Sequence, residues 1–164
     1  MIATRRQYKP HTLVVDTIFE TPDGAVCVTD FMPPRNENSS LVRIVRGIRG
    51  EVAMRMNLVI RFDYGRTIPW VTSTKGELRA VAGRDMVVLQ TKAPLRGEKM
   101  TTVSDFTVRA HETVTFTLTT LSSLSDVPPE TPPARALAET QRLWTDWTQR
   151  NTYNGPYKEA IERS

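Results

Sequence analysis

Residues 61–70, RFDYGRTIPW, hold the densest group of side chains that could contact a ligand. The group contains two guanidinium groups, one carboxylate and two aromatic rings, from Arg61, Arg66, Asp63, Tyr64 and Trp70. Such a group can stack against a sugar ring and hydrogen-bond its hydroxyls, or it can hold an ion pair that closes a hairpin corner. We favour the ion pair for Asp63 and keep the sugar contact as the alternative.

The other residue types that carry catalysis are poorly placed for it. Neither His11 nor His111 has a carboxylate or cysteine at the spacing of metal ligands, since Glu112 is merely adjacent to His111. The sequence has no G-x-S-x-G elbow, and its eight glycines form no phosphate-binding pattern. Cys27, the single cysteine, lies in the apolar run AVCV and is expected to be a buried, unreactive thiol. The sequence therefore predicts no catalytic residue, no metal site and no cofactor in this chain.

Positive charge is concentrated in one stretch of the chain. The formal net charge is +4, and residues 41–70 alone hold six arginines against two acids. A nucleic-acid surface would need clustered basic side chains, but this stretch has no lysine cluster. Arg55 and Arg61 instead alternate with apolar residues, as on the solvated face of a strand. The pattern therefore predicts no nucleic-acid partner.

No targeting or membrane segment is evident. The N-terminal residues MIATRRQYKP are not followed by the apolar run of a secretory signal, and no segment approaches the roughly 20 apolar residues of a membrane helix. We expect a cytoplasmic protein with no membrane partner.

The segment that leads into the 61–70 group, residues 51–64, alternates between apolar and polar side chains. Every even position from Val52 to Phe62 is apolar, and most odd positions are charged or polar. A period of two is that of a strand with one buried and one solvated face. Residues 112–120 alternate in the same way. Their apolar side chains are predicted to face the core, and the side chains predicted to face solvent are Thr113, Thr115, Thr117 and Thr119.

Further strands are predicted at short spacing. They cover residues 12–20, 25–31, 41–48, 78–82, 86–91 and 103–109. Turn signals separate them, including Pro22-Asp23-Gly24 and a tight connection at Arg49-Gly50. These connections are too short for the crossover of a parallel pair, so the strands are expected to form hairpins. The sequence predicts an all-β fold, an antiparallel β-sandwich over residues 1–121.

The composition changes after the last predicted strand. Residues 122–133 are proline-rich and indicate an extended linker, at whose end Thr131 is expected to cap a helix. The following region, 134–164, is predicted to hold that helix and the beginning of a second one. Trp144 and Trp147 lie on one face of the first helix and need a large apolar partner, because each would bury about 200 Å². Packing on the sandwich and docking on a neighbouring domain would both supply this partner.

Four blocks of the sequence resemble the bacterial glucoamylase- and trehalase-like glycoside hydrolases of the family-fifteen type, in order and at family-like spacing. The blocks are TPDGAVCVTDFMPPR (21–35), LVRIVRGIRGEVAMRMNLVIRFDYGRTIPW (41–70), APLRGEKMTTVSDFTV (93–108) and TQRLWTDWTQRNTYNGPYKEAIERS (140–164). The R-F-D-Y-G-R-x-x-P-W block is the most specific of these, and the resemblance spans nearly the entire chain.

The resemblance implies a partial enzyme. In that family an N-terminal antiparallel β-sandwich, supersandwich-like, is joined by a linker and helix to an (α/α)₆ barrel. The barrel supplies both catalytic glutamates of an inverting α-glucoside hydrolysis, and no catalytic glutamate can be carried over to this chain. Family members also usually have several dozen residues before the position of Arg5. The resemblance therefore implies a chain truncated before the barrel and not expected to be active alone.

The implied function is that of a non-catalytic module that braces the catalytic barrel. The 61–70 group is expected at the boundary with that barrel and at the rim of its sugar site, with an α-glucoside as candidate ligand, while Trp144 and Trp147 are expected to pack between domains. A stand-alone carbohydrate-binding sandwich is the alternative. Missing strands and a missing barrel would leave edges and aromatic surface uncovered, so self-association is expected as well.

Overall fold

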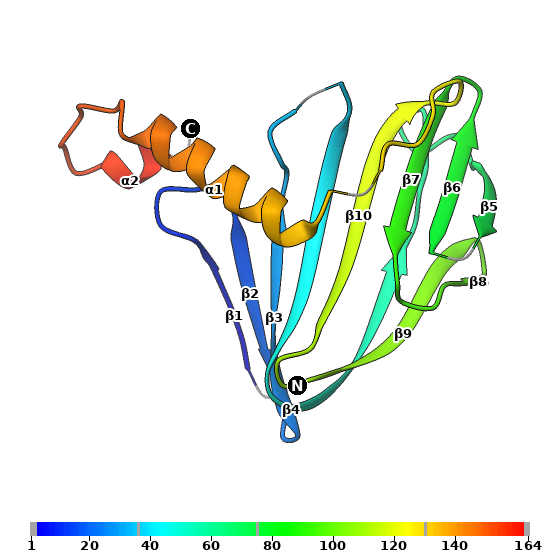
Figure 1. Cartoon of the computed structure of the whole chain (residues 1–164), viewed down its shortest axis with the longest axis horizontal. Helices are drawn as coiled ribbons and strands as arrows, with labels where there is room; N and C mark the ends of the chain where they lie inside the picture. The colour runs from blue at the N-terminus through cyan, green and yellow to red at the C-terminus, as the bar shows by residue number, and fades with distance from the viewer. Residues whose placement is uncertain (1–2, 36, 75, 130, 163–164) are drawn as a thin grey trace.

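The structure, a computed structural model, describes residues 3–35, 37–74, 76–129 and 131–162. Within these ranges every strand pairing is antiparallel, and the fold is a β-sandwich with a long helix on its outside (Figure 1). The strands and helices are β1 Ala3–Tyr8, β2 Val15–Glu20, β3 Gly24–Phe31, β4 Ser39–Leu58, β5 Trp70–Thr74, β6 Glu77–Ala82, β7 Asp85–Thr91, β8 Arg96–Glu98, β9 Thr101–Arg109, β10 Thr113–Ser122, α1 Pro133–Thr148 and α2 Lys158–Ile161. The predicted all-β sandwich is confirmed.

One long strand, β4, belongs to both sheets. The larger sheet has the order β1-β2-β3-β4-β10-β7-β6-β5, and the smaller one consists of β4, β9 and β8. Residues 39–46 of β4 pair with β10, whereas residues 51–58 pair with β9. The two sheets therefore share a continuous backbone through the middle of β4.

The predicted tight connection at Arg49-Gly50 is wrong, because the chain does not reverse there. The two strands predicted on either side of it are the two halves of β4. Between them the register with β3 shifts by one residue, and Gly50 takes a positive φ of 60°. This irregularity bends β4 and directs its second half out of the larger sheet.

The main core lies between the two sheets. Its buried members are Val26, Val28, Val45, Val52, Leu78, Leu89, Val108 and Phe116. Even-numbered side chains of residues 52–60 face this core, and every odd-numbered side chain from Glu51 to Arg61 is exposed, as the alternation predicted. The strand itself ends at Leu58, so the alternation continues into the loop that follows it.

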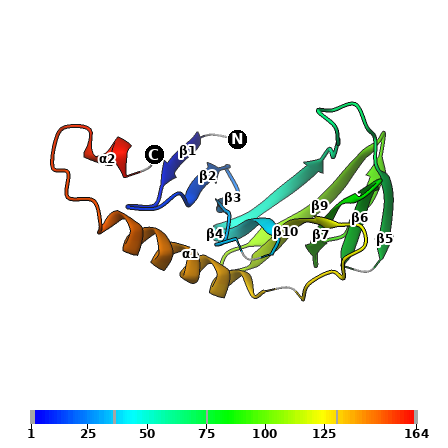
Figure 2. The same ribbon diagram turned by 90° about the horizontal axis from the view of Figure 1, so that it is seen from above.

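A second apolar layer lies on the outer face of the larger sheet, where α1 crosses the strands (Figure 2). Ala136 of α1 is buried with Val14, Phe31 and Val42, and Leu137 packs against the same cluster. Part of the linker also covers this face, because Val127 packs on a cluster formed by β7 and β10. The outer face is therefore only partly exposed to solvent.

This covering overturns one of the predictions for β10. Thr117 and Thr119 were expected to face solvent, but they are 8% and 4% exposed. Both lie on the outer face, beneath the linker and the first turns of α1. Their own strand carries no signal of this burial, because the covering residues come from elsewhere in the chain.

Helix α1 begins one residue later than a Thr131 cap would place it. Pro132 is the N-cap, no side chain caps the helix, and Pro133 occupies the first position, which its fixed φ suits. Thr140 is fully buried, and its hydroxyl donates to the Ala136 carbonyl at 2.7 Å. Neither helix of the described chain is long and apolar enough to cross a membrane.

Three strands that the pattern missed are short or fully exposed. Every residue of β1, β5 and β8 is exposed, so these segments carry no alternation of apolar and polar side chains. Strands β1 and β5 form the two edges of the larger sheet, and β8 forms an edge of the smaller one. An edge strand without a covered face has little sequence signal of its own.

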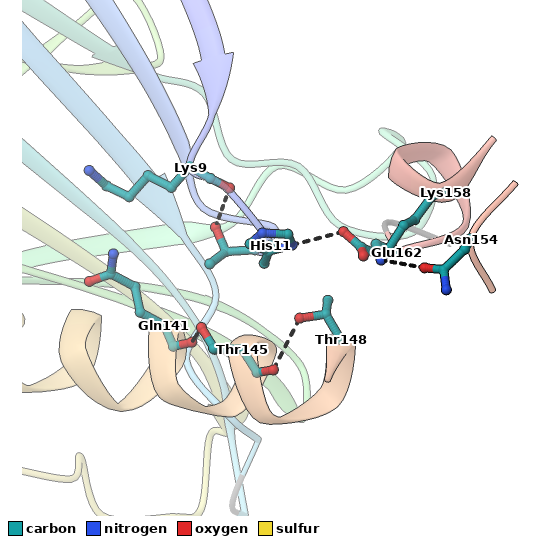
Figure 3. A network of polar contacts seen from close by, with 9 residues as sticks. Lys9, His11, Gln141, Thr145, Thr148, Asn154, Lys158 and Glu162 are labelled. Atoms are coloured by element: carbon teal, nitrogen blue, oxygen red, sulfur yellow. Dashed lines mark hydrogen bonds and ion pairs between the residues drawn. The ribbon is translucent and has the colours of Figure 1, made fainter. Parts of the chain in front are cut away.

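The C-terminal segment folds back toward the loop after β1 (Figure 3). The carboxylate of Glu162 lies 2.8 Å from Nδ1 of His11, and Lys158 donates to the side-chain oxygen of Asn154 at 3.0 Å. The second helix predicted from the sequence is observed as the short α2, although the last two residues of that prediction lie outside the described residues.

Candidate functional site

The residues between β4 and β5 form a tight corner. Phe62 and Thr67 face each other in a backbone bridge, with hydrogen bonds of 2.9 Å and 3.0 Å in the two directions. The Gly65 amide also donates to the Phe62 carbonyl, and the Arg66 amide donates to the Asp63 carbonyl. These bonds reverse the chain within four residues. The corner carries the backbone from the smaller sheet to the far edge of the larger one.

Two side-chain-bearing residues of this corner have left-handed backbone conformations. Asp63 has φ 48°, Tyr64 has φ 53°, and Gly65 follows with φ 90°. Such conformations cost about 1–2 kcal/mol per residue for anything but glycine, although aspartate tolerates them better than tyrosine does. The turn leaves Tyr64 wholly exposed. Residues held in strained backbone conformations occur often at active sites and ligand-binding regions.

The ion pair favoured for Asp63 does not form. Neither Arg61 nor Arg66 lies within ion-pair distance of its carboxylate, and Arg61 instead donates to the neighbouring Ile60 carbonyl at 2.7 Å. The prediction was wrong because proximity in sequence does not decide side-chain direction in a turn with positive φ. The Asp63 carboxylate and the Arg66 guanidinium group thus form no ion pair within the corner.

Beside the corner lies a cavity of about 370 Å³. Trp70, which is 78% exposed, lines it together with Ile68 and the β8–β9 hairpin at Lys99 and Met100. Most of its lining is apolar, with the charged groups of Arg61, Glu98 and Lys99 among it. An aromatic ring beside apolar walls and a few polar groups can accommodate a ring-shaped ligand or a side chain of a partner.

The structure therefore brings together only part of the predicted group. Arg61 and Trp70 share this cavity, whereas Asp63, Tyr64 and Arg66 do not line it. Sequence reasoning missed the contribution of the β8–β9 hairpin, since β8 is three residues long and fully exposed. The turn residues Lys99 and Met100 both have positive φ, but they are not the Asn-Gly or Asp-Gly pair that would predict such a turn from sequence.

The arginine-rich stretch is partly neutralised by acids from neighbouring strands. Arg43 binds Asp30 through two hydrogen bonds of 2.7 Å and 2.9 Å, and this carboxylate raises the pKa of Arg43. On the smaller sheet, Arg55 lies 2.7 Å from Glu98 and 3.8 Å from Asp105. In each pair the acid comes from another strand than the arginine, so the charge pattern of a single strand does not reveal the pairs.

The two helix tryptophans have different environments. Trp144 is half-buried, whereas Trp147 is 60% exposed and lines a groove with Ile161 of α2. The side chains buried on α1 are instead the small Ala136, Thr140 and Thr148. The helix therefore packs on the sandwich through small residues and leaves much of its aromatic surface uncovered.

The remaining candidate groups are Cys27, His11 and any set of metal-ligating side chains. Cys27 is buried, and desolvation, aided by the nearby charge of Asp16, raises the pKa of its thiol. His11 is exposed and lies against Glu162. No group of three metal-ligating side chains occurs among the residues that the structure describes.

Comparison with known proteins gives no family assignment. No family model matches the sequence, and no curated protein matches it. Among solved structures, a protein described as a kojibiose phosphorylase from the human microbiome is similar over 98% of this chain, with 8% sequence identity and a TM-score of 0.43. The chain spans 24% of that protein's length.

Proposed function

We propose that this chain is a non-catalytic N-terminal β-sandwich module of a glucoamylase- and trehalase-like glycoside hydrolase. Its work is to brace the (α/α)₆ catalytic barrel. The surface that contacts the barrel comprises the 61–70 corner and the exposed aromatic side of α1, and the corner contributes to the rim of the sugar site. The sequence blocks at residues 41–70 and 140–164 support this proposal through their resemblance to that family.

The observation that carries the proposal is the exposure of the aromatic residues in these blocks. Trp70, Tyr64 and Trp147 are 78%, 103% and 60% exposed, although large aromatic side chains provide most apolar area when they are buried. Trp70 begins β5, Tyr64 lies in the corner before it, and Trp147 lies near the end of α1. An aromatic surface of this kind, interspersed with arginines, is the composition of a protein contact.

The proposal is tested with the DNA on either side of this reading frame and the protein that it encodes. We expect a coding region for a helical barrel with two catalytic glutamates, and α-glucoside hydrolysis when that barrel is expressed together with this chain. Trp70→Ala and Trp147→Ala should each weaken the association about tenfold, as loss of an interface aromatic typically does. Ile48→Ala, which removes an exposed apolar side chain at the bend of β4, is the matched control.

Two results would contradict the proposal. One is that neither flank encodes a barrel and no separately encoded barrel binds this chain. The other is a barrel whose association and activity are the same with wild-type chain and with both tryptophan variants.

The cavity beside Trp70 favours a second candidate function, that of a stand-alone carbohydrate-binding sandwich. Titration calorimetry with trehalose, maltose and longer glucans should then give heat with this chain alone, and Trp70→Ala should weaken the binding. An absence of heat with all of these sugars would remove this candidate and leave the bracing function unaffected.

A further inference from the structure

The two sheets of the sandwich have their edges at β5 and β8, on the same side of the molecule (Figure 1). Strand β5 ends the larger sheet and β8 ends the smaller one. Among the described residues β5 pairs with β6 alone, and β8 pairs with β9 alone. Every residue of both strands is exposed. The outward backbone N–H and C=O groups of these edges can therefore pair with a further strand.

The two edges differ in how well they resist such pairing. Strand β8 has the sequence RGE, and both of its charged side chains form ion pairs with residues of the smaller sheet. Strand β5, WVTST, has neither a charged residue nor a proline. Charged residues and prolines are the usual protection of an edge strand against the addition of another strand. The edge that is most open to pairing is therefore β5.

The cavity of about 370 Å³ that Trp70 lines extends between these two edges. Its lining comes from β5 of the larger sheet and from β4, β8 and β9 of the smaller one, with the residues between β4 and β5 beside them. Leu58 and Ile60 of this lining also pack on the main core. Ile68, Val71 and Met100 are 53%, 46% and 64% exposed. The cavity thus continues the apolar core to the surface at the side of β5.

The alternation along β5 determines which side chains of an added strand would reach the cavity. Val71 and Ser73 lie opposite Ala80 and Leu78 of β6, which are 0% and 3% exposed. Leu78 belongs to the main core, so these two positions of β5 lie on the core face of the sheet. Every second side chain of a strand paired with β5 would lie on this same face. Apolar side chains at those alternate positions would fill the cavity.

The charged groups of the cavity favour an acidic partner. Glu98 is already paired with Arg55 at 2.7 Å. Arg61 and Lys99 line the cavity as well, and neither forms an ion pair with an acid among the described residues. The cavity adjoins β5 at the beginning of the strand, next to Val71. A carboxylate on the C-terminal end of an antiparallel partner would lie at this same end of β5.

We propose that β5 accepts an extended segment of a partner protein as an antiparallel strand. The segment has apolar residues at alternate positions and an aspartate or glutamate at its C-terminal end, next to Arg61 and Lys99. Backbone pairing would provide affinity, and the cavity would select the side chains, as in other peptides that bind to exposed sheet edges. A sugar in this cavity would leave the edge of β5 unpaired. The inference goes beyond the proposed function, because it concerns the edge of β5 and not the contact with a barrel.

The probe is a synthetic peptide of alternating isoleucine and threonine that ends in two glutamates. Titrated into the ¹⁵N-labelled whole chain, it should shift the backbone amide signals of residues 70–74 and 99–102 saturably, with high micromolar affinity. Val71→Lys places a charge on the edge and at the cavity, and it should weaken binding at least about tenfold. Val59→Lys changes an exposed valine that does not line the cavity and should bind the peptide like the wild type.

Modified peptides separate backbone pairing from simple apolar contact. Methylation of the backbone nitrogen at every second residue blocks the hydrogen bonds of one peptide edge and leaves the side chains unchanged. Methylation of one alternate set should abolish binding, and methylation of the other set should leave it largely intact.

The position of the acids is tested in the same way. Moving the two glutamates to the N-terminal end of the peptide should weaken binding about threefold, because an exposed ion pair contributes little. Lys99→Gln should weaken binding of the original peptide by a similar factor and should leave binding of the reversed one unchanged.

Several outcomes would overturn the proposal. Absence of saturable shifts at millimolar peptide would do so, and equal binding by the two methylated peptides would contradict strand pairing. Saturable shifts of the same residues with maltose, together with none from the peptide, would assign the cavity to a sugar. A dimer formed through β5 that excess peptide does not dissociate would identify a second copy of this chain as the occupant.

Discussion

Gly50 on β4 lies directly opposite Gly24 on β3, at the point where β4 leaves the larger sheet for the smaller one. A Cβ atom at either position would meet neighbouring backbone: that of Asp23 for Gly50, and that of Arg49, at 2.7 Å, for Gly24. The absence of both side chains allows the two strands to approach closely where β4 bends.

Gly50→Ala should therefore lower the free energy of unfolding by about 3 kcal/mol, the sum of left-handed backbone strain and the clash with Asp23. Urea unfolding followed by circular dichroism measures this loss. Gly83→Ala is the matched control, because Gly83 also has a positive φ, of 63°, but has open space around its Cβ direction. It should lose only about 1 kcal/mol. Equal losses for the two variants would show that the close approach at Gly50 contributes nothing.

Ala136 should be essential for the docking of α1. It is 3% exposed and lies against Val14, Phe31 and Val42, so Ala136→Lys would place a charge in an apolar cluster. The expected result is release of the helix, seen as faster protease cleavage in residues 123–133 while the strands remain folded. Ala138→Lys changes an exposed position of the same helix and should be cleaved like the wild type. Indistinguishable cleavage of the two variants would contradict this docking.

Burial of Cys27 gives a specific dependence of stability on pH. The pKa of its thiol is raised above the ordinary value of 9.0, mainly by desolvation and further by Asp16. The folded chain therefore holds this proton more tightly than the unfolded chain does. The corresponding stability is fully present below pH 9 and is lost as the pH rises through the folded-state pKa.

Urea midpoints measured at increasing pH above 9 should thus fall more steeply for the wild type than for Cys27→Ala. The native thiol should also react slowly with a thiol-specific reagent at pH 8 and rapidly after unfolding. Parallel pH profiles of the wild type and the variant would exclude the contribution of Cys27.

The exposed β5 edge should promote self-association of the isolated chain. Residues 70–74, WVTST, are uncharged and each is exposed, whereas β1 at the other edge carries Arg5 and Arg6. An uncharged edge strand can pair with a second copy, and a lysine within it discourages this pairing. Val71→Lys should therefore shift the sedimentation profile toward monomer at high micromolar concentration. Val59→Lys, at an exposed valine outside the strands, should not. A sharp monomer peak for the wild type would contradict the expectation.

Core residues could be predicted where the alternation of apolar and polar residues within one strand decides which face is buried. Residues 52–60 alternate because one face of the chain packs between the sheets and the other meets solvent, and the structure has the same faces buried and exposed. The burial of Thr117 and Thr119 could not be predicted in this way, since the residues that cover them come from the linker and α1. Periodicity reports the local face of a strand and not what later covers it.

The exposure of the 61–70 corner could be predicted from the sequence, but the contacts of its side chains could not. The arginines, aspartate and aromatic residues at 61–70 do form an exposed corner, yet Asp63 makes no ion pair with its neighbours. Left-handed conformations at Asp63 and Tyr64 decide where these side chains lie. The companion hairpin at Lys99 and Met100 reaches the corner only through the pairing of β9 with β4, a contact of high sequence separation.

Because β4 is shared between the two sheets, it also determines which parts of the protein unfold together. Neither sheet can unfold independently of the other, because β4 is a strand of both. Backbone amides of β4 on both sides of the bend should therefore exchange with deuterium in the same cooperative unfolding step. The amides of the edge strands β1 and β5 should exchange much earlier.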